Sequence, residues 1–142
     1  MNLCPCGARG DPAGRCSCAP ERVHRYREKL SRALLDRFDL ALAVPRPRGT
    51  ELAGPPGEPS AAVAERVEAA RGRLAVASSP LDGEARDLLT RAVERLPLSG
   101  RGRARVARVA STIAALAGAE RIAPEHLAEA LSYRSPSELA VS

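Results

Sequence analysis

The stretch SGRGRARVARVASTIAAL, residues 99–116, decides the fold. Its large apolar residues recur at spacings of three and four, which is the pattern of an amphipathic helix with one buried face. These residues are Val106, Val109, Ile113 and Leu116. Ser99 is a favourable N-cap residue, and Gly118 suits the left-handed position that ends many helices. We therefore predict a helix that begins after Ser99 and buries one face.

Three more helical patterns surround this one. Ser60 can cap the first, Asp82 can cap the second, and Pro124 suits the first turn of the last. The chain has one Phe, two Tyr and no Trp, so its core must consist of Leu, Val, Ile and Ala, which suits closely packed helices. The sequence predicts a mainly α protein with a bundle of four helices over residues 60–134.

The rest of the chain has a different character. Residues 21–37 show helical spacing, and residues 38–44 alternate between apolar and other residues, which predicts a short strand. A strand without a partner is unstable. Residues 49–59 are rich in Pro and Gly and predict a linker between this part, 21–48, and the bundle. The polar end, residues 135–142, is predicted to be disordered.

The first 20 residues contain two Cys-x-Cys pairs and almost no large apolar residue, so they need a cross-link to fold. Four thiolates suit a closed tetrahedral zinc site of structural type, formed by Cys4, Cys6, Cys16 and Cys18. Glycines that permit the required turns lie at positions 7, 10 and 14. Reduced free thiols are the first alternative and disulfides the second. We expect His24 and His126 to be ordinary residues of helix surfaces.

Charge and composition exclude several classes of protein. The net charge is +5, and the whole excess of basic residues lies within residues 1–48. Lys29 is the one lysine and follows no glycine-rich turn, so these 142 residues hold no P-loop. No Ser/His/Asp or Cys/His set suggests hydrolysis. The sequence has no apolar run of about 20 residues and no signal peptide pattern, so we expect a cytoplasmic protein without membrane contacts.

Two arginines stand in unusual local settings. Arg37 lies between a helical pattern and the predicted strand, and Arg101 lies in the first turn of the helix after Ser99, where free N–H groups favour an anion. The residues alone also allow Arg37 to pair with a neighbouring aspartate and Arg101 to be solvated. Arg101, Arg105 and Arg108 share one face of this helix. This face either contacts a nucleic-acid backbone or is exposed to solvent alone.

Several phrases together resemble a known family. These phrases are NLCPCG at 2–7, CSC at 16–18, RYREKLS at 25–31, LLDRFDL at 34–40, SGRG at 99–102, VARVASTIA at 106–114 and HLAEALSYR at 126–134. Their order and spacing resemble the C-terminal portion of the magnesium chelatase-like AAA+ ATPases of the ComM/YifB type. The resemblance covers nearly the whole chain.

The resemblance implies an ATP-driven ring, usually a homo-hexamer, whose members act on DNA as branch-migrating helicases. In its pattern Arg37 matches the arginine finger that acts in trans, and Arg101 matches the sensor-2 arginine that contacts the ATP phosphates. It also implies a helical lid over 60–134, preceded by the zinc knuckle and by a remnant strand of the AAA+ core at 38–44. The family's P-loop lies upstream of the matching part, so ATP and Mg²⁺ belong to the full-length parent, and we expect the chain alone to be inactive. The alternative is a free-standing zinc-containing DNA-binding or adaptor module.

Overall fold

The computed structural model describes residues 2–11, 14–35, 37–76, 80–96 and 98–134. These described residues fall into two compact units, which we call unit 1, within Met1–Pro55, and unit 2, Pro56–Arg134. Helices account for nearly all the regular structure of both units, so the predicted mainly α class is confirmed. The predicted disordered tail at 135–142 lies outside the described residues.

The described residues of unit 2 form four helices, as the sequence predicts: α4 (Ser60–Val76), α5 (Gly83–Arg95), α6 (Gly100–Leu116) and α7 (Pro124–Ser132). Two of the predicted caps are present. Ser99 Oγ accepts the N–H of Gly102 at 3.0 Å, and Asp82 Oδ1 accepts the N–H of Ala85 at 2.7 Å. Ser60 differs from the prediction, because it is the first residue of α4 and does not precede it. Each capped start satisfies an N–H that has no partner within its own helix.

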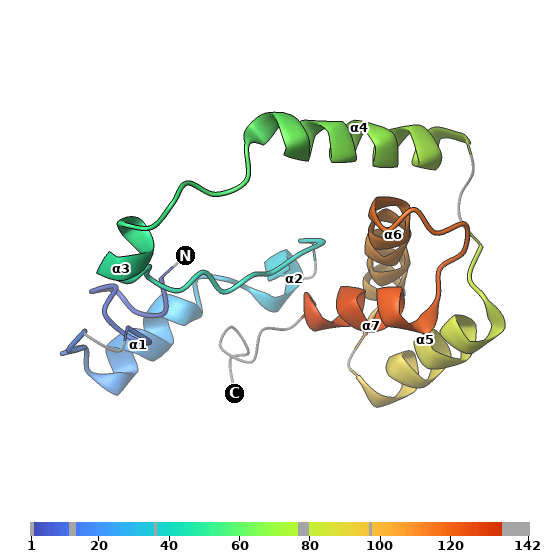
Figure 1. Ribbon diagram of the computed structural model, residues 1–142. Helices are drawn as coiled ribbons and strands as arrows, with labels where there is room; N and C mark the ends of the chain where they lie inside the picture. The colour runs from blue at the N-terminus through green and yellow to red at the C-terminus, as the bar shows by residue number, and fades with distance from the viewer. Residues whose placement is uncertain (1, 12–13, 36, 77–79, 97, 135–142) are drawn as a thin grey trace. The chain divides into compact units, whose positions relative to one another are not determined.

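Helix α6 is the centre of unit 2. Helices α4 and α7 both pack on α6, and α5 packs on α7 (Figure 1). A short parallel bridge between Leu81 and Ile122 joins the segments that lead into α5 and α7. The main-chain N–H of Asp82 donates to Ile122 O at 3.1 Å, and this bond fixes where α5 begins relative to α7.

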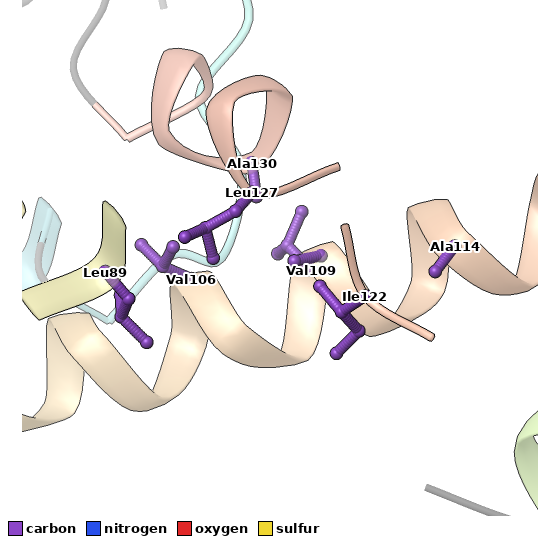
Figure 2. Packing of buried hydrophobic residues seen from close by; sticks show 8 residues of the cluster. Leu89, Val106, Val109, Ala114, Ile122, Leu127 and Ala130 are labelled. Carbon is purple, nitrogen blue, oxygen red and sulfur yellow. The ribbon is translucent and has the colours of Figure 1, made fainter. Parts of the chain in front are cut away.

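The core of unit 2 consists of aliphatic side chains from α5, α6, α7 and the segment before α7. Leu127 of α7 lies against α6 beside Val106 and Val109, while Leu89 of α5 lies at one end of the cluster (Figure 2). Leu127 and Val106 are both fully buried. Alanines on the facing surfaces, such as Ala114 and Ala130, allow the helices to approach closely.

Unit 1 contains the short helices α1 (Pro20–Arg27), α2 (Arg32–Leu35) and α3 (Gly49–Leu52). The single helix predicted over residues 21–37 is therefore divided in two. Ser31 Oγ accepts the N–H of Leu34 at 3.2 Å, which starts α2 separately. A serine that binds the main chain in this way competes with a continuous helix, and this explains the break. Helix α3 lies in the stretch that the sequence predicted as a linker.

The strand predicted at residues 38–44 does not form. These residues contain neither helix nor strand, and their alternating apolar side chains are largely exposed, with Val44 at 89%. A strand exists through hydrogen bonds to a neighbouring strand, and the described residues offer none to this segment. Alternation of apolar residues is thus not sufficient to make a strand here.

Among the helices within the described ranges, none combines the length and the apolar character that a bilayer crossing requires.

Candidate metal centre and two candidate arginines

The loops that carry the cysteines are held by tight turns at glycines. The N–H of Gly7 donates to Cys4 O at 3.1 Å, and Gly7 has a φ of +79°, a conformation that side-chain-bearing residues rarely adopt. Gly10 is similar, with a φ of +85°. A Cβ at Gly14 would lie 2.9 Å from Ala8 O, which is too close for any larger residue. The glycines therefore allow the chain to return upon itself between the two cysteine pairs.

This loop brings the four cysteine sulfurs together. Cys4 Sγ lies 3.4 Å from Cys6 Sγ and 3.6 Å from Cys16 Sγ, and all four sulfurs lie within 4.8 Å of one another. A tetrahedral zinc ion with Zn–S bonds of about 2.3 Å separates its sulfurs by about 3.8 Å. The four thiols are free, so the disulfide alternative is not seen. Cys4, Cys6, Cys16 and Cys18 form a cluster that can bind a metal ion.

The surroundings shift the pKa values of Cys4 and Cys16 in opposite directions. Burial raises the pKa of the Cys4 thiol, but the Arg9 N–H, which donates to Cys4 Sγ at 3.4 Å, and the neighbouring thiols lower this pKa from 9.0 to about 6. The Cys18 N–H works against any rise at Cys16, but burial and the neighbouring thiols raise the pKa of Cys16 to about 11. Four sulfurs this close together can all carry negative charge only with a cation among them.

Helix α1 follows the cysteine loop and contacts it. Val23 is the buried residue of α1, with 4% exposure, and Arg27 Nε donates to Leu3 O at 3.4 Å. Arg46 Nη1 lies 3.1 Å from Asp11 Oδ2, which ties the later part of unit 1 to the cysteine loop. The contacts of Arg27 and Arg46 therefore connect the rest of unit 1 to the cysteine loop.

The two histidines take no part in the cluster. His24 is exposed, and its Nδ1 lies 3.5 Å from Glu28 Oε2, as expected for a residue on a helix surface. His126 differs from the expectation because it is half-buried and its Nδ1 accepts the Ala123 N–H at 3.1 Å. This bond satisfies a main-chain donor at the start of α7, so His126 has a structural role.

Arg37 and Arg101 belong to different units. Arg37 is exposed in the turn after α2, where its N–H donates to Leu34 O at 2.9 Å; it does not lead into a strand. Arg101 is exposed in the first turn of α6, which has no acidic residue. On the same face, Arg108 is exposed and Arg105 is half-buried.

The side chain of Arg134, a residue that the sequence alone did not single out, lies at the start of α6. An ideal Cβ on Gly102 would lie 3.4 Å from Arg134 Nη2 and 3.5 Å from Ser99 Oγ. Gly102 itself is buried, which is unusual for a residue in the first turn of a helix. The second glycine of SGRG was the available signal, because a glycine inside a helix often marks a close approach by another group.

Comparison with known proteins gives consistent results for both units. The family described as magnesium chelatase, subunit ChlI C-terminal, matches residues 57–134, which is nearly all of unit 2. The family described as magnesium chelatase, subunit ChlI, matches residues 1–52, which is most of unit 1.

Individual relatives span both units. The protein YifB of Escherichia coli is 38% identical over 87% of this chain, and the competence protein ComM of Haemophilus influenzae is 37% identical over 95% of it. The chain spans 28% of the length of the first relative and 30% of the second.

Proposed function

This chain belongs to the magnesium chelatase-like family of ComM and YifB, and from that premise we propose that it is the C-terminal portion of an ATP-driven AAA+ motor that acts on DNA. In this proposal unit 2 is the helical lid over the nucleotide, and unit 1 carries the end of the AAA+ core with a zinc knuckle. Neighbouring subunits assemble as a homo-hexameric ring around the DNA, and the protein works in the cytoplasm.

The observation that carries the proposal is the position of Arg101 in a unit that matches the family along nearly its whole length. Arg101 is exposed in the first turn of α6, and Ser99 fixes that turn by accepting the Gly102 N–H. The positive end of a helix dipole and a planar guanidinium both favour a phosphate group. The absence of acidic residues in this turn leaves both available. Arg101 then serves as the sensor-2 arginine for the ATP bound by its own subunit.

Arg37 has the complementary role in this proposal. It is exposed in unit 1, and a finger must extend from the surface of one subunit to the γ-phosphate in the next. An arginine finger accelerates phosphoryl transfer by about 10³–10⁵-fold, because it stabilises charge that develops in the transition state. Within the 142 residues no glycine-rich turn carries a lysine, so the phosphates and Mg²⁺ are held by the part of the parent protein that contains a P-loop.

The cysteine cluster holds a structural zinc ion in this proposal. Its four sulfurs are close enough to share one tetrahedral ion, and four thiolates leave no open position for a substrate. Zinc supplies the positive charge that lets all four thiols ionise, and it fixes the cysteine loop beside α1. The zinc therefore orders unit 1 and takes no part in the hydrolysis of ATP.

The proposal is tested with a chimera in which this chain replaces the matching C-terminal portion of Haemophilus influenzae ComM. DNA-stimulated ATP hydrolysis is measured for the chimera and for its Arg37→Ala and Arg101→Ala variants. Each substitution should lower kcat by at least about 10²-fold. Arg25→Ala in unit 1 and Arg103→Ala in α6 are the controls, since both replace exposed arginines. If either variant hydrolyses ATP as fast as the unsubstituted chimera, the role proposed for that arginine is wrong.

A further inference from the structure

The segment after α7 holds Arg134 in a defined place. The Arg134 N–H donates to Leu131 O at 3.1 Å, which continues the turn at the end of α7. Tyr133, the residue before it, packs against the core of unit 2, and its hydroxyl donates to Glu129 Oε1 at 2.8 Å. Both contacts fix the main chain from which the Arg134 side chain extends.

From this place the Arg134 guanidinium lies against the first turn of α6. An ideal Cβ on Gly102 would be 3.4 Å from Arg134 Nη2, 3.5 Å from Leu98 Cδ2 and 3.5 Å from Ser99 Oγ. A small residue at position 102 therefore lets the guanidinium of Arg134, which follows α7, pack on the first turn of α6. A methyl group would still fit at these distances, whereas a larger side chain would displace Arg134.

The first turn of α6 needs such a contact. Glycines at 100 and 102 flank Arg101, and a glycine destabilises a helix relative to alanine because it has more conformational freedom to lose. The helix start that carries Arg101 is thus intrinsically loose. The cap from Ser99 and the packing of Arg134 both restrain it at Gly102.

We propose that Arg134 is a positioning residue for Arg101: it packs across Gly102 and holds the first turn of α6 in the orientation that presents Arg101 to a polyphosphate. The proposal rests on the proposed function, because that function makes Arg101 a phosphate ligand. It adds a link from the end of α7 to the nucleotide site. Arg134 acts through the main chain of α6 and does not itself contact the phosphate.

The test uses the full chain and inorganic tripolyphosphate at constant ionic strength. The Kd is obtained from the NMR signals of the Arg101 and Gly102 amides. Arg134→Gln should raise the Kd by about tenfold, since a small misplacement of a binding group has a large effect. Arg134→Lys should be nearly as defective, because a lysine keeps the charge but lacks the planar group that packs on the glycine. Arg121→Gln, an exposed arginine of unit 2, should leave the Kd unchanged.

A second substitution separates positioning from a direct contact. Gly102→Ala fits beside Arg134 and stiffens the helix start, so the double variant Gly102→Ala/Arg134→Gln should recover most of the affinity that Arg134→Gln loses. An unchanged Kd in Arg134→Gln, recovery of affinity by lysine, or failure of the double variant to recover it would each overturn the proposal. Arg101→Gln tests the proposed function separately from the role of Arg134. If Arg101→Gln leaves the Kd unchanged, the proposed function fails as well. If it weakens binding while Arg134→Gln does not, only the role of Arg134 fails.

Discussion

Arg73 of α4 donates from Nη1 to the main-chain oxygen of Ala115, 2.8 Å away in the last turn of α6. This oxygen also accepts the N–H of Gly118 at 3.2 Å, and the negative end of the helix dipole favours a cation at this position. Ala70, a small side chain, is the buried residue of α4. The bond from Arg73 therefore adds a polar attachment of α4 to α6.

Replacing Arg73 should loosen this attachment. We expect Arg73→Ala to lower the free energy of unfolding of the chain by about 1 kcal/mol, which is the usual contribution of such a hydrogen bond. Arg71→Ala is a matched control from the same helix, because Arg71 forms an exposed ion pair with Glu68. Its effect should stay below about 0.5 kcal/mol. Urea unfolding followed by circular dichroism measures both, and equal effects would mean that the bond to Ala115 contributes nothing.

The start of α4 should make stability depend on pH. The hydrogen bonds from Arg66 lower the pKa of Glu58 from its ordinary 4.5, against a smaller opposing effect of burial. A lowered pKa in the folded state stabilises the protein above pH 4.5, and this contribution is lost as the pH falls through the lowered pKa. Glu58→Gln should thus be less stable than the unsubstituted chain at pH 7. At pH values below the pKa of Glu58 in the folded state, the two chains should be equally stable. A difference in urea midpoint that persists unchanged at low pH would contradict the assignment.

Unit 2 should fold by itself. Its core is complete within Pro56–Arg134, and a chain that begins at Pro56 should be helical, unfold cooperatively and keep a midpoint close to that of the same unit in the whole chain. Leu127→Ala should destabilise it by about 2–5 kcal/mol, because Leu127 is fully buried. Leu116→Ala is the control, since Leu116 is 48% exposed and should cost about 1 kcal/mol or less. If the isolated unit proves unfolded by circular dichroism, unit 1 is part of the same fold.

The cysteine cluster should bind a single zinc ion per chain. Elemental analysis of the purified chain should find it, and Cys4→Ser should lose it, whereas Ser17→Ala, between two of the ligands, should keep it. Removal of the metal by a chelator should unfold the cysteine loop and leave the unfolding midpoint of unit 2 unchanged, since the loop has little apolar surface of its own. Four thiols that react freely in the native protein would show that no metal is held.

The sequence predicts unit 2 well because its helices are specified locally. Ser99, Asp82 and Pro124 each mark a helix start by a side-chain or main-chain property that acts within one turn, and the structure confirms all three starts. The cysteine cluster was predictable for a similar reason, because two short pairs of ligands and three glycines encode it within 20 residues.

Features that depend on distant partners were not predictable. The alternation at residues 38–44 favours a strand, but a strand needs a neighbour, and the pattern of one segment does not say whether a neighbour exists. Arg134 and Gly102 are 32 residues apart, and their contact arises from the way α7 packs on α6. His126 was expected on the surface because it follows Pro124 and Glu125, yet it is half-buried and accepts the N–H of Ala123.

The central claim is that Arg101 serves the ATP site of its own subunit while Arg37 serves that of its neighbour, and mixed rings test it most directly. The ComM chimera is prepared as two inactive variants, Arg37→Ala and Arg101→Ala, which are mixed in equal amounts and allowed to exchange subunits. In a head-to-tail ring about a quarter of the interfaces then pair an intact Arg101 with an intact Arg37 from the next subunit. We predict that the mixture regains ATP hydrolysis at about a quarter of the rate of the unsubstituted chimera. A mixture that stays as inactive as its components would contradict the account, since both arginines would then have to act within one subunit.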